Sequence, residues 1–251
     1  MGRSVIRLKT PEEIEKIRAA GRILRNALNA AGAAVKPGVK TAALDELIRD
    51  VIESSGGRPA FRGYRGFPGT SCISVNEEVV HGIPGNRTIA EGDLVGIDIG
   101  VELDGYFADA CETYAVGEIG DAASRLISVT RNALAKGIAQ CRAGRHVGDI
   151  SHAVQVYVEA NGFSVVRELV GHGVGKALHE DPQVPNFGPS GRGPLLQPGV
   201  VLAIEPMVNE GTESVRTLKD EWTVVTADGK LSAHFEHTVA ITEDGPSILT
   251  L

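Results

Sequence analysis

The order helix, helix, strands occurs twice along this chain, and this repetition restricts the fold more than any other feature of the sequence. A shift of 107 residues pairs Asp98 with Glu205, and a shift of 127 residues pairs Asp109 with Glu236. Each half thus places two acids at matching positions of its strands. A pseudo-twofold arrangement would bring these four carboxylates to one centre.

Periodic apolar positions and turn residues define the elements of both halves. Thr10, Pro11 and Glu13 form the pattern of a capped helix start. We expect helices near 11–28, 41–52, 121–142 and 148–160, and strands near 72–75, 79–83, 94–103, 106–116, 163–170, 199–204, 223–225 and 237–241. This order predicts an α+β fold in a single domain, 1–251, with halves of about 11–118 and 121–251.

The clearest local signal is a β-hairpin. Asp104-Gly105 is a typical two-residue type I′ turn between two strand patterns. In the register that this turn sets, Gly100 faces Asp109, and Asp98 lies on the same face of the hairpin. The two aspartates are then diagonal neighbours, with β-carbons about 7 Å apart. The opposite face is apolar and should be the core.

Two carboxylates on one face repel each other and need a cation or a proton when they are buried. An ordinary solvated face is the alternative for a single aspartate pair. Glu205 and Glu236, however, stand in apolar or strand-like contexts where an unpaired charge is costly. The four acids therefore predict a centre that binds divalent cations.

Histidines supply the remaining candidates. His172 and His179 lie seven residues apart in a glycine-rich segment. This would be about 10.5 Å along a helix, so we expect at most one of them to be a metal ligand and the other to be free to contact substrate. His81 is a third candidate, with a structural histidine as the alternative. The remaining histidines are expected to be surface or structural residues: His146, His152, His234 and His237.

Four carboxylates with one imidazole suit divalent Mn, Fe, Co or Zn. Two ions that share carboxylates can lower the pKa of a bridging water enough to make it a nucleophile at neutral pH. Hydrolysis is the chemistry that this ligand set predicts.

Charge and composition exclude several classes of function. With 25 Lys plus Arg against 32 Asp plus Glu, the net charge is −7, and no broad basic field would attract nucleic acid. We find neither a secretory signal pattern at the start nor an apolar stretch of roughly 20 residues. We therefore expect a cytoplasmic protein without a membrane segment. Cys72, Cys111 and Cys141 are far apart in sequence and should be reduced and buried.

Nine motifs, in their order and spacing, resemble the type I methionine aminopeptidases of the creatinase/aminopeptidase or pita-bread fold. The resemblance covers essentially the whole chain and implies a central curved antiparallel sheet flanked by helices. It also implies metal-dependent removal of N-terminal methionine, preferentially before a small second residue. The motifs are 63–68, 72–77, 80–84, 92–98, 105–109, 171–175, 204–207, 222–224 and 235–238.

Carried over to this chain, the resemblance implies a role for each metal ligand. Asp109 and Glu236 would bridge two divalent ions (Co, Mn, Fe or Zn). Asp98 would complete the second site, and His172 with Glu205 the first. Glu205 would also be the general base when a metal-bridging hydroxide attacks the scissile carbonyl.

The resemblance also assigns residues to the substrate. His179 would contact the scissile peptide and its tetrahedral intermediate, and His81 the amine end of the substrate. The methionine pocket would be lined by Tyr64, Phe67, Cys72, Leu178 and Trp222. The family often has Tyr in place of Phe67 and Phe in place of Leu178, which affects the shape of the pocket. Phe61 is expected either to narrow the pocket or to belong to the core.

The expected partners are the N-termini of nascent polypeptides, acted on by a monomer, with docking at the ribosome near the exit tunnel as an open alternative. Xaa-Pro peptidases share the fold but resemble longer chains with an extra N-terminal domain. Type II methionine aminopeptidases have an insertion between the last two acids, which here are 31 residues apart. A non-catalytic protein of this fold would have lost metal ligands, whereas all five are present here.

Overall fold

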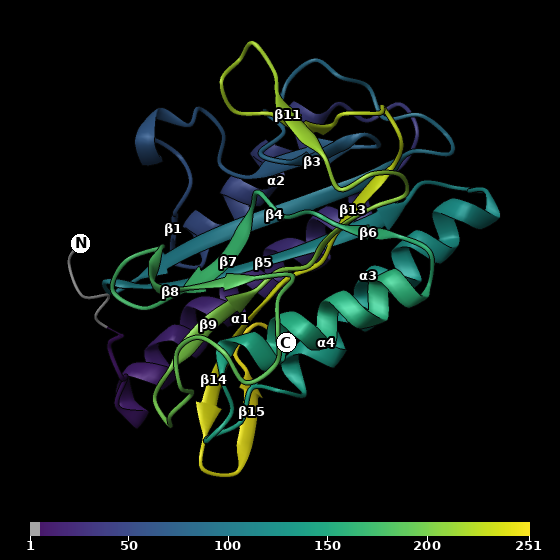
Figure 1. Cartoon of the computed structure of the whole chain (residues 1–251). Helices are drawn as coiled ribbons and strands as arrows, with labels where there is room; N and C mark the ends of the chain where they lie inside the picture. Colours follow the sequence, from purple (N-terminus) through teal and green to yellow (C-terminus); the bar gives the residue numbers. More distant parts are fainter. Residues whose placement is uncertain (1–5) are drawn as a thin grey trace.

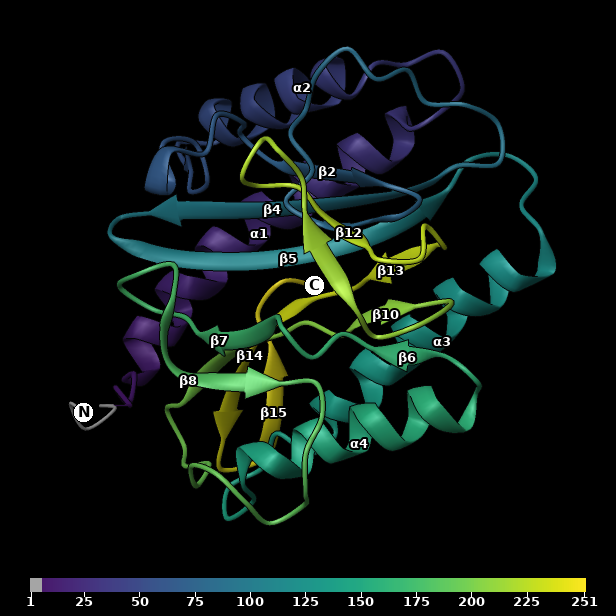
Figure 2. The same cartoon turned by 45° about the horizontal axis from the view of Figure 1, so that its top comes forward.

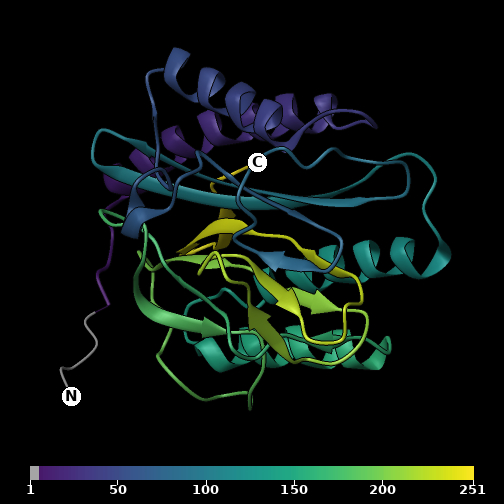
Figure 3. The same ribbon diagram turned by 90° about the horizontal axis from the view of Figure 1, so that it is seen from above.

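Two pairs of helices enclose a set of antiparallel sheets in the computed structural model, which describes residues 6–251 (Figure 1). One pair packs above the sheets and the other below them when the molecule is turned by 90° (Figure 3). The helices are α1 (Pro11–Ala34), α2 (Thr41–Ser54), α3 (Asp121–Ile138) and α4 (Val147–Ala160), with a 3₁₀ turn at Tyr64–Gly66.

The strands form one four-stranded, one five-stranded and two three-stranded sheets. The four-stranded sheet contains β1 (Arg58–Pro59), β2 (Cys72–Val75), β4 (Leu94–Leu103) and β5 (Tyr106–Ala115). The five-stranded sheet runs in the order β15 (Gly245–Ile248), β14 (His237–Thr242), β9 (Val201–Ile204), β7 (Val170–Gly173), β8 (Glu180–Pro185).

The two small sheets complete the architecture. One has the order β13 (Ser232–His234), β10 (Met207–Asn209), β6 (Ser164–Val165). The other has the order β11 (Val215–Thr217), β12 (Val224–Thr226), β3 (Glu78–Val80).

The predicted start of the first helix is confirmed. The Thr10 hydroxyl accepts a hydrogen bond from the Glu13 N–H at 3.3 Å, and the Glu13 carboxylate accepts one from the Thr10 N–H at 3.0 Å. This reciprocal capping box satisfies two N–H groups that the first turn leaves free. Helix α3 ends at Ile138, earlier than expected, and the chain then turns at Gly144, where φ is positive at 84°.

The predicted hairpin and its register are also confirmed. Strands β4 and β5 form the long curved ribbon in Figure 2, and Asp104 and Gly105 both take positive φ in the turn between them. Gly100 pairs with Asp109, and Asp98 pairs with Cys111. The apolar face of the hairpin packs on α1 in one core that includes Ile97, Ile99, Val101, Ala108 and Ala110.

A second core lies beneath the other helix pair. Leu126 and Leu134 of α3 and Val154 of α4 pack against Leu202 and Ile204 of β9. Each helix pair thus covers its own apolar core, and the strands that carry or flank the four acids lie between the pairs. The division into two related halves of a single domain stays a prediction.

Several strands lie outside the predicted ranges: β1, β8, β10, β11, β13 and β15. The edge strands β8 and β15 are two of them. Pro182 and Pro185 lie in β8, and Pro246 lies in β15, so the local pattern argued against strands. Both strands are at the ends of the five-stranded sheet. An edge strand tolerates proline, because the missing N–H can be on the side that faces away from the neighbouring strand. The expected strand at 163–170 is instead divided between β6 and the first residue of β7.

None of the helices within residues 6–251 combines the length and apolar character needed to cross a membrane. The start of the chain, on which the expectation of no signal segment also depends, lies outside the described residues.

The segment before α1 is tied to the loop that enters β8. The Lys9 ammonium is 2.7 Å from the Glu180 carboxylate, and the two side chains are only 6% and 10% exposed. The same carboxylate accepts hydrogen bonds from the N–H groups of Lys176 and Ala177, at 2.8 and 3.2 Å. This pair therefore holds the loop that connects β7 with β8.

Replacing Lys9 by methionine should lower the free energy of unfolding by about 3 kcal/mol, because a buried Glu180 carboxylate loses its partner. Denaturation in guanidinium chloride measures the effect. The double variant Lys9→Met/Glu180→Gln is the control and should recover much of the loss. A single variant as stable as the unmodified protein would show that the pair contributes little.

Candidate metal centre

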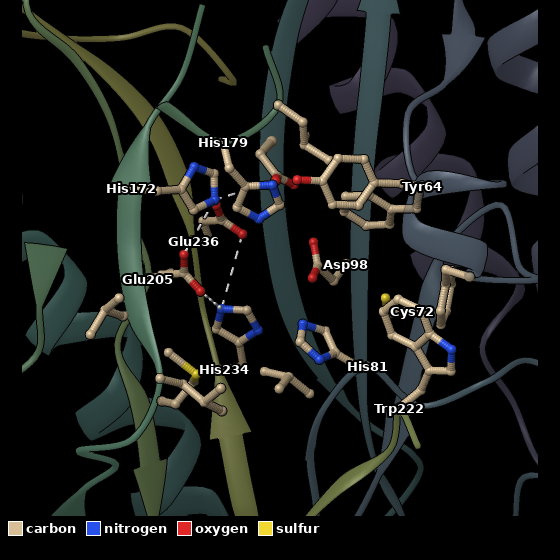
Figure 4. Close-up of a pocket in the computed structure, with 18 of the residues that line it drawn as sticks. Tyr64, Cys72, His81, Asp98, His172, His179, Glu205, Trp222, His234 and Glu236 are labelled. Carbon is tan, nitrogen blue, oxygen red and sulfur yellow. Dashed lines mark ion pairs between the residues drawn. The ribbon is translucent and has the colours of Figure 1, made fainter. Parts of the chain in front are cut away.

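A cavity of about 280 Å³ lies between the β4–β5 hairpin and the segments that follow β9 and β13. Figure 4 shows its two ends. Carboxylates and imidazoles gather at one end, and Tyr64, Cys72 and Trp222 lie at the other. The cavity therefore combines a polar centre with an adjoining apolar pocket.

All four predicted acids line this cavity. Asp98 comes from β4, Asp109 from β5, Glu205 directly follows β9, and Glu236 lies between β13 and β14. Asp109 and Glu236 are 4% and 2% exposed. The folded chain thus brings together acids that are up to 138 residues apart in sequence.

Hydrogen bonds between β5 and residues 236–238 hold two of these acids in place. The Glu236 N–H donates to the Cys111 carbonyl at 2.9 Å. The Thr238 hydroxyl accepts from the Asp109 N–H at 2.9 Å and donates to the Asp109 carbonyl at 2.8 Å. The backbones that carry Asp109 and Glu236 are therefore joined directly.

Burial raises the pKa values of all four acids, and repulsion from neighbouring acids adds to this effect for Asp109, Glu205 and Glu236. Burial raises the pKa of Asp98 to about 7. The pKa values of Asp109 and Glu205 are raised well above the usual range, mainly by burial and next by the charge of Asp98. The pKa of Glu236 is also raised well above the usual range, mainly by burial and next by the charge of Asp109. One oxygen each of Asp98, Asp109 and Glu236 is buried without a hydrogen-bond partner among residues 6–251. Buried, unpartnered carboxylate oxygens suit cation ligands.

His172, on β7, points one ring nitrogen at these acids. Its Nδ1 is 2.9 Å from the Gly173 carbonyl, which must accept a hydrogen from it, so Nε2 keeps a free lone pair. Nε2 is 3.5 Å from Glu205 and 3.9 Å from Asp109. Burial lowers the pKa of His172 to about 4, so the ring is neutral. Ligand atoms of Asp109, His172 and Glu236 all lie within 4.8 Å of one another.

His179 lies much closer to His172 than a helix would allow. Their ring centroids are 4.1 Å apart, because the intervening residues form the loop between β7 and β8. The helical distance therefore does not apply to this segment, and the expectation that at most one of these two histidines is a metal ligand stays a prediction. His179 also stacks on Tyr64 at 5.2 Å, and His81 lies edge-on to Trp222 at 6.3 Å.

The apolar end of the cavity contains every residue predicted for a side-chain pocket. Phe67, Cys72 and Leu178 are buried together with Phe61, and Tyr64 and Trp222 pack against them. The rings of Phe67 and Trp222 meet edge to face at 5.1 Å. Phe61 therefore contributes to the wall of the cavity as well as to a packed cluster.

His234 corrects the expectation that it is a surface or purely structural residue. It lines the cavity and is 4% exposed, whereas His152 is exposed on α4 and His237 pairs with Thr250 at 2.9 Å. The signal in the sequence was its position two residues before Glu236, since residues i and i+2 of an extended chain share a face. Burial lowers the pKa of His234 to about 3.

The chain was compared with known families and proteins. Residues 15–243 match the family described as Metallopeptidase family M24. The chain is 54% identical to methionine aminopeptidase 1 of Bacillus subtilis over 96% of this chain and 98% of that protein. It is 53% identical to methionine aminopeptidase of Clostridium perfringens over 98% of this chain and 99% of that protein.

Solved structures show the same similarity. Methionine aminopeptidase from Thermotoga maritima superposes with a TM-score of 0.97 at 46% identity, covering 98% of this chain and 99% of the other. Prolidase from Pyrococcus furiosus superposes with a TM-score of 0.79 at 24% identity. The match covers 97% of this chain but only 65% of the prolidase chain, so this likeness concerns the fold alone. The predicted pita-bread fold is confirmed.

In the metal-free protein, Asp98 should make a contribution to stability that is lost as the pH rises from about 4 to about 7, whereas His172 and His234, whose pKa values burial lowers, contribute a slope of opposite sign in part of this range. The pKa of Asp98 is raised from 3.8 to about 7, so its protonated form stabilises the fold below its ordinary pKa and this contribution is lost as the pH passes the raised value. Urea denaturation of chelator-treated protein across this range measures the slope. Relative to the unmodified protein, Asp98→Asn should gain stability as the pH rises through this range, because it lacks the Asp98 contribution. A stability difference between the two proteins that does not change with pH, or that changes in the opposite direction, would contradict the interpretation.

Proposed function

Since this chain belongs to metallopeptidase family M24, we propose that it removes the N-terminal methionine from nascent proteins and peptides, preferentially when the second residue is small. The observation that carries the proposal is that a cluster of buried acids and an apolar pocket line one and the same cavity. The methionine aminopeptidases to which the chain is similar, at 44–54% identity over nearly the full length, support it.

Five residues would hold two divalent ions of Co, Mn, Fe or Zn: Asp98, Asp109, His172, Glu205 and Glu236. Their unpartnered oxygens and the free Nε2 of His172 fit such ions. When bound, the ions would polarise the scissile carbonyl and lower the pKa of the attacking water. The protein would supply the positions of the acids and the cavity that they line.

Glu205 is the proposed general base. It directly follows β9, and its two oxygens face His172 and His234 at 3.5 and 3.7 Å. Burial raises its pKa, which brings the carboxylate closer to the range in which it can take a proton from water at neutral pH. Its later transfer of this proton to the leaving amine would complete the hydrolysis.

The histidines outside the metal set would bind the reacting peptide. His179, which stacks on Tyr64 beside His172, would donate a hydrogen bond to the scissile carbonyl. Burial lowers the pKa of His179 to about 3, so this donor is a neutral imidazole. His81, which lies beside Trp222 on the cavity wall, would contact the amine end of the substrate.

The methionine side chain would occupy the apolar end of the cavity. Phe67 and Trp222 would contact it with their rings, and the thiol of Cys72 and the side chain of Leu178 would close the pocket. A flexible thioether packs well on aromatic and sulfur-containing surfaces. Leu178 is 2% exposed and packs among aromatic residues, so it sets part of the pocket's width.

The proposed substrate places the enzyme in the cytoplasm, where it would act as a monomer on polypeptide N-termini near the ribosomal exit tunnel. A net charge of −7 supports a peptide rather than a nucleic acid as the substrate.

Replacing Glu205 by glutamine should reduce release of methionine from Met-Gly peptides by roughly 100-fold to 10,000-fold, because the amide cannot accept the proton of the attacking water. The assay uses protein loaded with Mn, Co or Fe. His152→Ala, on the exposed face of α4, is the matched control and should be fully active. Equal rates for Glu205→Gln and the unmodified protein would refute the general-base role.

The enzyme should also remove its own initiator methionine, because Gly2 is a small second residue. These two residues lie outside the described part of the chain, so the prediction depends on the sequence alone. The intact mass of protein made in cells should correspond to a chain that begins at Gly2, whereas Gly2→Arg should keep Met1. Full retention of Met1 in the unmodified chain would contradict the proposed preference.

A further inference from the structure

His234 is the one histidine at the polar end of the cavity that the proposed function does not use. Its Nε2 is buried and has no hydrogen-bond partner among residues 6–251. This nitrogen is 3.7 Å from Glu205 Oε2 and 4.0 Å from Glu236 Oε2 (Figure 4). A buried imidazole nitrogen without a partner is costly, so its position requires an explanation.

The distances match a shared cation better than direct hydrogen bonds. An N–H···O hydrogen bond spans about 2.7 to 3.2 Å. Two atoms that each lie about 2.1 Å from one ion, at a tetrahedral angle, are about 3.4 Å apart. The separations around His234 resemble those around His172, which are 3.5 and 3.9 Å.

The two imidazoles also occupy equivalent surroundings. One group of possible ligand atoms, all within 4.8 Å of one another, comprises Asp109, His172 and Glu236. A second group with the same limit comprises Glu205, His234 and Glu236. Each group has two carboxylates and one histidine, and Glu236 belongs to both.

The backbone of His234 is clamped, so the ring is held in this position. Its N–H donates to the Thr113 hydroxyl at 3.0 Å, and that hydroxyl donates back to the His234 carbonyl at 2.8 Å. His234 also pairs with Met207 in the sheet formed by β13 and β10. Ligands fixed in this way lose little conformational freedom when they bind an ion.

We propose that His234 is a direct ligand of a divalent cation, together with Glu205 and Glu236. The inference rests on the proposed function in that it shares these two acids with the metal centre. The centre would then have two imidazole ligands instead of one.

A second imidazole would change which metals the centre prefers. Carboxylate and water ligands suit Mn²⁺, whereas imidazole ligands suit Zn²⁺ and Fe²⁺. The affinity of a given site also rises in general from Mn²⁺ to Co²⁺. His234→Gln keeps a polar side chain of similar length without an imidazole nitrogen. This substitution should weaken Co²⁺ binding roughly tenfold or more and Mn²⁺ binding less, as titration calorimetry of chelator-treated protein would show.

Nitrogen coupling to bound Mn²⁺, detected by electron spin-echo modulation, tests ligation independently of catalysis. His172→Ala with one equivalent of Mn²⁺ should retain coupling from an imidazole nitrogen, and His172→Ala/His234→Gln should lose it. His152→Ala is the control and should match the unmodified protein. Nitrogen coupling that is the same in the single and double variants would overturn the inference.

If these variants do not fold, the metal-loaded unmodified protein keeps the inference testable. At full occupancy with Co²⁺, proton spectra should contain shifted exchangeable signals from two metal-bound imidazole rings, and signals from one ring only would overturn it. Failure of the proposed function is distinguishable, because His234 would still ligate Co²⁺ in a protein that releases no methionine. A protein that binds neither Mn²⁺ nor Co²⁺ would overturn both proposals.

Discussion

Four buried carboxylates in one cavity impose the constraint on which the rest of this structure depends. Burial raises the pKa values of Asp98, Asp109, Glu205 and Glu236, and the charges of neighbouring acids raise those of the last three further. Several of their oxygens lack hydrogen-bond partners among the described residues. Such a cluster needs protons or cations to offset its charge. The surrounding fold must hold it together against this repulsion.

The β4–β5 hairpin and the segment around Glu236 provide that support. Backbone hydrogen bonds join Cys111 to Glu236, and the Thr238 hydroxyl bridges to the backbone of Asp109. The apolar faces of these strands pack into two cores, one under each helix pair. The cost of bringing the acids together is therefore offset by apolar burial on the opposite faces of the same strands.

The sequence predicted the elements whose information is local. A capping box at Thr10 and an Asp-Gly turn each depend on a few adjacent residues, and both are observed. The period of two then correctly placed Asp98 and Asp109 on one face of the hairpin. The edge strand β8 was missed because its prolines argue against a strand, and its place at the sheet edge is a property of the whole fold.

For the site, the sequence by itself determined the hairpin register, the four acids and the residues that resemble a methionine pocket, because turn chemistry, strand alternation and motif spacing are encoded in neighbouring positions. Only the tertiary structure placed the ring of His179 against that of His172 and turned Nε2 of His234 toward Glu205. Those contacts depend on how loops and strands far apart in the chain pack together. The pattern of apolar and polar residues within one segment cannot predict how far that segment lies from another segment in the folded protein.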